Sequence, residues 1–143
     1  MKRILSFVMT MVLLVMCIAP VAQAASECTP YASKYFSSYS VSLDHDGNTL
    51  SANFAVFGTR ILDRLGAKTI YFQRSSNNKS WTTVKTVSYT SMAELMKNST
   101  TLHGTTVSYN ATPGYYYRAY IVLWAEFNGD NEYRHLYTNS ICL

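Results

Sequence analysis

The sequence is poor in charge, and this absence narrows the class of protein before any motif is considered. Only 14% of the 143 residues are charged, whereas 48% are hydrophobic, and globular proteins average about 25% charged residues. A disordered chain needs low hydrophobicity and high charge, so the composition predicts one folded domain of ordinary size. The formal net charge is +4 and no cluster of lysine or arginine follows residue 3, which argues against nucleic-acid binding.

The sequence also lacks the motifs that mark common active sites. It contains no HExxH, no GxSxG and no glycine-rich phosphate loop. The three histidines, His45, His103 and His135, lie far apart, and each fits an ordinary surface position. Acidic turns at 44–48 and 128–132 resemble calcium loops only superficially, because hairpin turns explain the same residues. We therefore expect no catalytic residue, metal or cofactor, with a hydrolase site assembled by folding as the alternative.

The first 24 residues predict an export signal. A short basic start, Met1-Lys2-Arg3, precedes an apolar run from Ile4 to Ala19, and Ala22-Gln23-Ala24 supplies the small residues that signal peptidase requires. The run of about 16 residues is shorter than the ~20 that span a bilayer, so we favour cleavage over a membrane anchor. Cys17 does not follow the small residues expected before a lipidated cysteine, and no cell-wall anchor motif is present. We expect a secreted protein with no membrane contact after cleavage.

Removal of the signal changes both the charge and the cysteine count. The formal net charge falls from +4 to +2 because Lys2 and Arg3 are lost, so basicity gives no argument for an acidic partner. Of the three cysteines, Cys28 and Cys142 remain, one near each end of the mature chain. An even pair in an exported protein predicts a disulfide, and two free thiols are the alternative. No histidine lies at zinc-ligand spacing from either cysteine.

Alternation of apolar and polar residues predicts an all-β domain with seven antiparallel strands. The expected strands are 38–43, 50–56, 68–74, 81–87, 105–109, 115–127 and 132–141. Asp46-Gly47 predicts a hairpin turn between the first two strands. A connector is expected over 58–66, and a short helix over 91–98, where Ser91 and Glu94 fit a capping box. The mature chain thus divides into an N-terminal segment, 25–37, and a β domain, 38–143.

Strands and turn signals at this spacing along the sequence are typical of an antiparallel sandwich of the immunoglobulin or fibronectin type III kind. A small β-barrel is the alternative. The predicted strand 115–127 carries an unbroken apolar face made of Tyr117, Ala119, Ile121, Leu123 and Ala125. Pro113-Gly114 before Tyr117 resembles the turn and the tyrosine that open the equivalent strand of fibronectin type III domains.

Three stretches also resemble a family of small exported proteins from Gram-positive gut bacteria, which is known only as a domain of unknown function. They are Ser37-Ser38-Tyr39-Ser40-Val41-Ser42, Phe57-Gly58 and Leu65-Gly66-Ala67-Lys68-Thr69-Ile70. The similarity covers about residues 31 to 140. It implies export from a Gram-positive bacterium and a β-sandwich, and it transfers no catalytic residue and no cysteine pair.

The predicted strand 115–127 also offers the candidate binding surface. Opposite its apolar face project Tyr116, Arg118, Tyr120, Val122, Trp124 and Glu126. Exposed aromatics flanked by charges suit sugar stacking or protein contact, so we predict a ligand row of Tyr116, Arg118, Tyr120 and Trp124. Outward aromatics also stabilise sheets through cross-strand pairs, and this structural role is the competing interpretation.

These expectations favour a secreted, non-catalytic binding module whose partner is a protein or a glycan outside the cell. A secreted hydrolase and an inhibitor or toxin-like effector are the alternative functions. The binding interpretation requires Tyr116, Tyr120 and Trp124 to be exposed together as one row.

Overall fold

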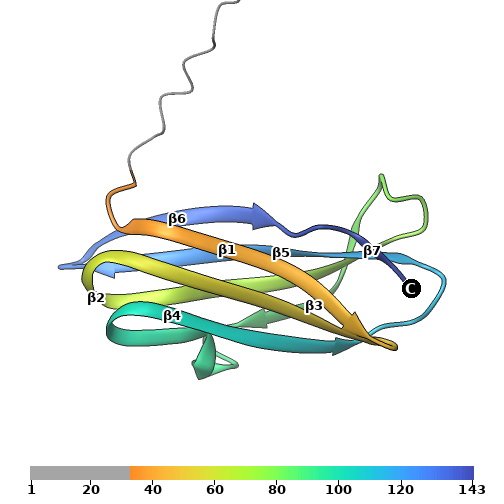
Figure 1. Ribbon diagram of the computed structural model, residues 1–143, viewed down its shortest axis with the longest axis horizontal. Helices are drawn as coiled ribbons and strands as arrows, with labels where there is room; N and C mark the ends of the chain where they lie inside the picture. The colour runs from red at the N-terminus through yellow and green to blue at the C-terminus, as the bar shows by residue number, and fades with distance from the viewer. Residues whose placement is uncertain (1–32) are drawn as a thin grey trace, which may run out of the picture. The chain divides into compact units, whose positions relative to one another are not determined.

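The computed structural model describes residues 33–143, so the expected export signal, Cys28 and most of the predicted N-terminal segment lie outside the described part. Within it, seven strands form one antiparallel sheet (Figure 1). The elements are β1 (Phe36–Asp46), β2 (Thr49–Ser75), β3 (Thr82–Ser88), a 3-10 turn (Ala93–Leu95), β4 (Met96–Asn110), β5 (Tyr116–Phe127), β6 (Asp130–Tyr137) and β7 (Ile141–Cys142). No helix among the described residues is long and apolar enough to cross a membrane.

The long strand β2 pairs with four other strands and so joins them into one sheet. Its first half, up to Phe57, pairs with β1 on one side and β4 on the other, and its second half pairs with β5 and β3. A register shift in the β4 pairing lies between Phe57 and Leu62. Such an irregularity bends a strand and increases its twist, so the sheet curls instead of lying flat (Figure 1).

The connector predicted over 58–66 is wrong, because this stretch continues β2. Leu62 and Leu65 are fully buried, while Asp63 and Arg64 between them are exposed. An extended chain paired with β4 buries both leucines and satisfies the backbone groups at the same time. A loop would achieve neither.

The all-β class and the seven antiparallel strands are confirmed, although the strands are divided differently. The expected strands 50–56 and 68–74 are both parts of β2, and the expected last strand is split into β6 and β7. Neither the two-sheet sandwich nor the barrel is confirmed, because hydrogen bonding joins all seven strands into one sheet.

The helix predicted over 91–98 is also wrong. Only a 3-10 turn, Ala93–Leu95, is present, and no side chain caps it. The Ser91 hydroxyl donates to the carbonyl of Ser88 at 2.8 Å, so the expected capping box does not form. Leu95 is fully buried and β4 begins at the next residue, so pairing with β2 takes the place of further helical turns.

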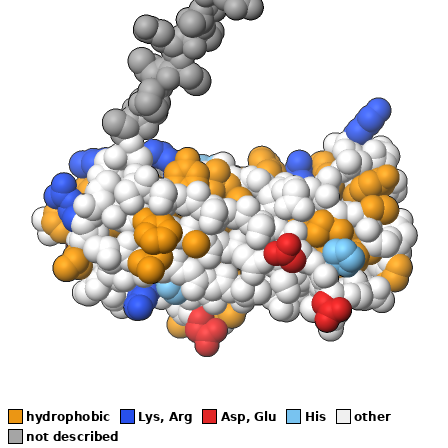
Figure 2. All heavy atoms as spheres, in the orientation of Figure 1, with side chains coloured by type: hydrophobic (Ala, Val, Ile, Leu, Met, Phe, Trp, Pro, Cys, Tyr) orange, Lys and Arg blue, Asp and Glu red, His pale blue; other side chains and the backbone are white. Residues whose placement is uncertain are grey.

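Inward side chains of β1, β2, β4 and β5 meet in a single core. The apolar face predicted on 115–127 is confirmed, because all five members are fully buried: Tyr117, Ala119, Ile121, Leu123 and Ala125. They share one cluster with the inward side chains of β2, which include Leu50, Ala52, Phe54, Val56, Ile70 and Phe72. The outer surface is poor in charge; Figure 2 shows a face on which uncharged side chains predominate.

Tyr117 fixes the turn that precedes β5. Its buried hydroxyl donates to the carbonyl of Thr112 at 2.9 Å and accepts from the N–H of the same residue at 3.1 Å. The hydroxyl therefore ties the start of β5 to the turn before it.

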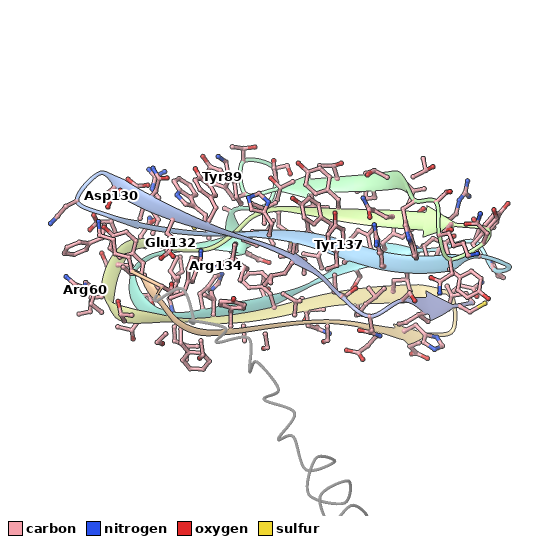
Figure 3. All side chains as sticks on the ribbon, turned by 90° about the horizontal axis from the view of Figure 1, so that it is seen from above. Arg60, Tyr89, Asp130, Glu132, Arg134 and Tyr137 are labelled. Carbon is pink, nitrogen blue, oxygen red and sulfur yellow. The ribbon has the colours of Figure 1, made fainter. Side chains whose placement is uncertain are left out.

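The beginning of β1 is tied to β6, the strand at the other edge of the sheet. The Ser33 hydroxyl donates to both carboxylate oxygens of Glu132, at 3.0 and 3.1 Å, and the Tyr35 N–H donates to one of them at 2.8 Å. Lys34 pairs with Asp130, whose carboxylate also accepts from the Tyr35 hydroxyl at 2.8 Å. Figure 3 shows Asp130 and Glu132 on β6. The folded domain therefore includes these residues ahead of the boundary predicted at 38.

A side-chain amide links the same two edges further along. Asn139, just after β6, accepts from the N–H of Leu43 and donates to the carbonyl of Leu43, each at 3.3 Å. The amide thus pairs with β1 as a neighbouring strand would. Together with the contacts of Ser33 and Tyr35, it keeps the sheet curled.

Replacement of Tyr117 by Phe should lower the free energy of unfolding by about 1–3 kcal/mol, because the N–H and carbonyl of Thr112 lose their partner. Urea denaturation followed by circular dichroism measures the loss. Tyr109→Phe is the matched control, since the Tyr109 ring lies only 6.4 Å from that of Tyr117 but does not bridge this turn. Equal losses in the two variants would contradict the role given to the Tyr117 hydroxyl.

Asp130 should make the fold more stable above pH 4 than below it. Hydrogen bonds from Lys34, first, and from Tyr35 lower the pKa of Asp130 below its ordinary value of 3.8. A carboxylate with a lowered pKa in the folded state contributes stability above its ordinary value and loses it as the pH falls through the lowered one. Asp130→Asn should therefore be less stable than the native protein at pH 6, and the difference should shrink in unfolding curves recorded below pH 3.8.

Lys34→Met provides the control for this pH dependence, because it removes the largest cause of the lowered pKa. In that background, Asp130→Asn should have a smaller effect at pH 6. A loss of stability that is independent of pH and of Lys34 would contradict the interpretation.

Candidate functional site

Outward side chains of β2, β5 and β6 form rows that cross the three strands. Alternate residues of a strand point to the same face, and the register places these residues side by side. Three successive rows are the tyrosine row (Tyr71, Tyr120, Tyr137), the middle row (Thr69, Val122, His135) and the tryptophan row (Trp124, Tyr133).

The tyrosine row is a continuous stack. The Tyr120 ring centroid lies 5.5 Å from that of Tyr71 and 4.7 Å from that of Tyr137, with both pairs of planes inclined by only 24°. Both faces of the Tyr120 ring are thus covered by neighbouring rings, and its hydroxyl lies 2.6 Å from Nδ1 of His135. Burial, and then the neighbouring Tyr137 and Tyr71, raise the pKa of Tyr120.

The tryptophan row is similarly packed. The Trp124 and Tyr133 rings are nearly parallel, with planes inclined by 5° and centroids 6.2 Å apart, and Tyr89 lies 5.6 Å from Trp124. Lys68 Nζ and the Arg64 guanidinium lie over the indole at 5.5 and 5.6 Å. Only 8% of Trp124 is exposed, and its Nε1 has no hydrogen-bond partner among the described residues.

The prediction that Tyr116, Tyr120 and Trp124 are exposed together on β5 is therefore wrong. Trp124 is buried, Tyr120 has both ring faces covered, and Tyr116 is half-buried. The Arg118 guanidinium is held between two aromatic rings, 4.2 and 4.3 Å from their centroids, and its Nε donates to Gln73 at 2.8 Å. These contacts are the cross-strand pairs of the competing interpretation, and they leave little ring surface for a flat ligand.

A groove crosses the sheet where the middle row separates the two aromatic rows. Thr69 and Val122 are shorter than the rings on either side, so the surface is hollowed between them. The groove has a volume of about 380 Å³ and is lined by Lys68, Thr69, Tyr71, Tyr120, Val122, Tyr133 and His135. Of these residues, the sequence-based site contained only Tyr120.

A β-bulge places Lys68 at this groove. Along β2, Ala67 lies opposite Leu123, but Thr69, two positions later, lies opposite Val122. Lys68 is therefore the extra residue without an opposite partner, and such bulges redirect side chains. Strict alternation would place Lys68 and Thr69 on opposite faces, whereas the bulge brings both to the groove.

Lys68 carries a positive charge that forms no ion pair with a carboxylate in the described part of the chain. Its Nζ lies 3.2 Å from the Tyr133 hydroxyl and 4.8 Å from the centre of that ring. Lys34, Arg64 and Arg134, by contrast, each pair with a carboxylate. No Asp or Glu lines the groove, so its charge is positive.

The three histidines do not come together. His45 Nδ1 lies 3.3 Å from the carbonyl of Gly47, His103 Nε2 lies 2.8 Å from the carbonyl of Glu94, and His135 faces Tyr120. Within residues 33–143 no group of three or more metal-ligating side chains is present.

The predicted disulfide involves a residue outside the described part, since Cys28 precedes residue 33. Cys142, the last residue of β7, is exposed and free in the described structure.

Comparison of this chain with protein-family models, curated proteins and solved structures found no match. The groove therefore has to be interpreted from its own chemistry.

Proposed function

We propose that this protein is a secreted, non-catalytic binding module that holds its ligand in the groove between the tyrosine row and the tryptophan row. The observation that carries the proposal is the interruption of an otherwise continuous aromatic surface by two short side chains, Thr69 and Val122. Rings locked by stacking lose little entropy when a ligand binds, which favours recognition by a preformed site.

Binding is favoured over catalysis by the chemistry of the lining. The groove offers hydroxyl groups, one ammonium group and one imidazole, but no carboxylate and no thiol. A hydrolase site usually needs a nucleophile and base, or a pair of carboxylates, in mutual reach. His135, the lining histidine, is oriented by a tyrosine hydroxyl instead of an acid.

We propose that the fold is a variant of the fibronectin type III sandwich. The pairing supports two layers, one of β1, the first half of β2 and β4, and another of β3, the second half of β2, β5 and β6. In this interpretation two strands that are separate in the parent fold are fused in β2. The hydrogen bonds of Tyr117 to Thr112 also support this fold, because in immunoglobulin-like domains a tyrosine near the start of one strand bonds to the backbone a few residues upstream.

We also propose export through the signal at residues 1–24, from a Gram-positive bacterium, and a disulfide between Cys28 and Cys142. An even pair of cysteines in an exported chain supports the bridge, and two free thiols are the alternative. Cys142 is exposed at the end of β7.

A groove-filling variant tests the proposed function. Val122→Tyr adds a ring to the middle row and should abolish binding on a glycan array, while stability is kept or raised by about 0.2–1 kcal/mol through new cross-strand pairs. Ser108→Tyr, at an exposed position of β4, is the matched control and should bind as the native protein does. Glycan binding that Val122→Tyr leaves intact, or no glycan binding by the native protein, would contradict the proposal.

Electrophoresis without reductant tests the disulfide. The oxidised secreted protein should migrate as a monomer, faster than after reduction, and Cys142→Ser should abolish this difference. Free thiols at both cysteines, or a dimer that reductant converts to monomer, would contradict the bridge.

A further inference from the structure

We propose that the groove selects a carboxylate-bearing sugar, such as a uronic acid residue of a polysaccharide, over a neutral sugar. The proposal rests on the proposed function, because it names the ligand class of the same groove. Three independent features of the lining support it.

The first feature is the charge of Lys68. Lys68 is half-buried as a residue, its ammonium group lies over the rings of Trp124 and Tyr133, and it forms no ion pair with any described carboxylate. Its single hydrogen bond, to the Tyr133 hydroxyl, leaves two of its three N–H groups for a ligand. Because partial burial strengthens the interaction of a cation with an anion, a carboxylate in the groove would find a charge-assisted partner here.

The second feature is the orientation of the aromatic rings. The faces of Tyr120 are occupied by Tyr71 and Tyr137, and Trp124 packs against Tyr133. The Tyr120 hydroxyl lies 2.6 Å from Nδ1 of His135 in the middle row, so Tyr120 presents its hydroxyl and the adjoining ring edge to the groove. Ring edges carry the positive part of the aromatic quadrupole, so these walls favour an anionic or hydroxyl-rich ligand over one that stacks on a face.

The third feature is the small size and the hydroxyl content of the groove. Its volume of about 380 Å³ is near the lower end of the ~300–1,000 Å³ typical of small-molecule sites, which suits one or a few sugar rings better than a folded partner. Thr69, Tyr71, Tyr120 and Tyr133 contribute hydroxyl-bearing side chains to the lining. A hydroxyl both donates and accepts, as the hydroxyls of a pyranose require.

Isothermal titration with three probes tests the proposal: tri-galacturonic acid, galactotriose and hexa-glutamate. The native protein should bind tri-galacturonic acid at least about tenfold more tightly than galactotriose at low salt, and high salt should weaken that preference. Lys68→Gln should lose most of the preference, measured as the ratio of the two affinities, and Lys68→Arg should keep part of it. Lys79→Gln, at an exposed position before β3, is the matched control and should change neither affinity.

The outcomes distinguish the proposed binding groove from its proposed preference for an acidic sugar. Equal binding of tri-galacturonic acid and galactotriose, blocked by Val122→Tyr, would overturn the acidic preference and leave the binding groove in place. Binding of hexa-glutamate as tightly as tri-galacturonic acid, with the same dependence on Lys68, would overturn the assignment to a sugar. No binding of any probe, together with an empty glycan array, would overturn both proposals.

Discussion

The continuous hydrogen bonding of β2 positions everything else in this fold. A single strand, Thr49–Ser75, pairs with β1, β4, β5 and β3 in turn, so a change in its register would move every partner at once. Its irregularities determine the shape of the sheet. The shift between Phe57 and Leu62 curls the sheet around the core, and the bulge at Lys68 alters the outer face. The groove is thus a consequence of how β2 is paired and is not a feature added on a loop.

The outer face of the second half of β2, β5 and β6 stabilises the sheet and also carries the proposed binding groove. Aromatic pairs contribute about 0.5–1.5 kcal/mol each beyond the burial of their area, so the tyrosine and tryptophan rows stabilise the sheet in their own right. Tyr120 and Trp124 have ring faces covered by neighbouring rings, whereas Tyr137 on the edge strand is 55% exposed. We expect the ligand where the stack of rings is interrupted. Thr69 and Val122 therefore mark the position of the groove, although neither is aromatic or charged. Their small size gives up one row of packing and leaves a groove, whose positive charge comes from Lys68.

Much of the fold could be predicted from the sequence, because alternation reports which side of a strand is buried. The inward face of β5 and the first hairpin follow from this pattern. The stretch 58–66 and the segment 91–98 could not be predicted, since Gly58, Gly66 and the capping pattern at Ser91 carry loop and helix signals that pairing with β4 overrides. Local propensity loses there to the burial of Leu62, Leu65 and Leu95.

The candidate site was harder to predict than the fold. The alternation on β5 identified its outward residues, but exposure depends on neighbours from β2 and β6 that cross-strand register alone brings together. The position of Lys68 depends on a bulge, for which the sequence has no signal beyond an ordinary alternating strand. Solution NMR of the labelled protein with added tri-galacturonic acid tests the central claim most directly. We predict chemical-shift changes centred on Lys68, Thr69, Val122 and His135, with the outward residues of β4 unchanged; changes centred on another face, or none, would contradict the account.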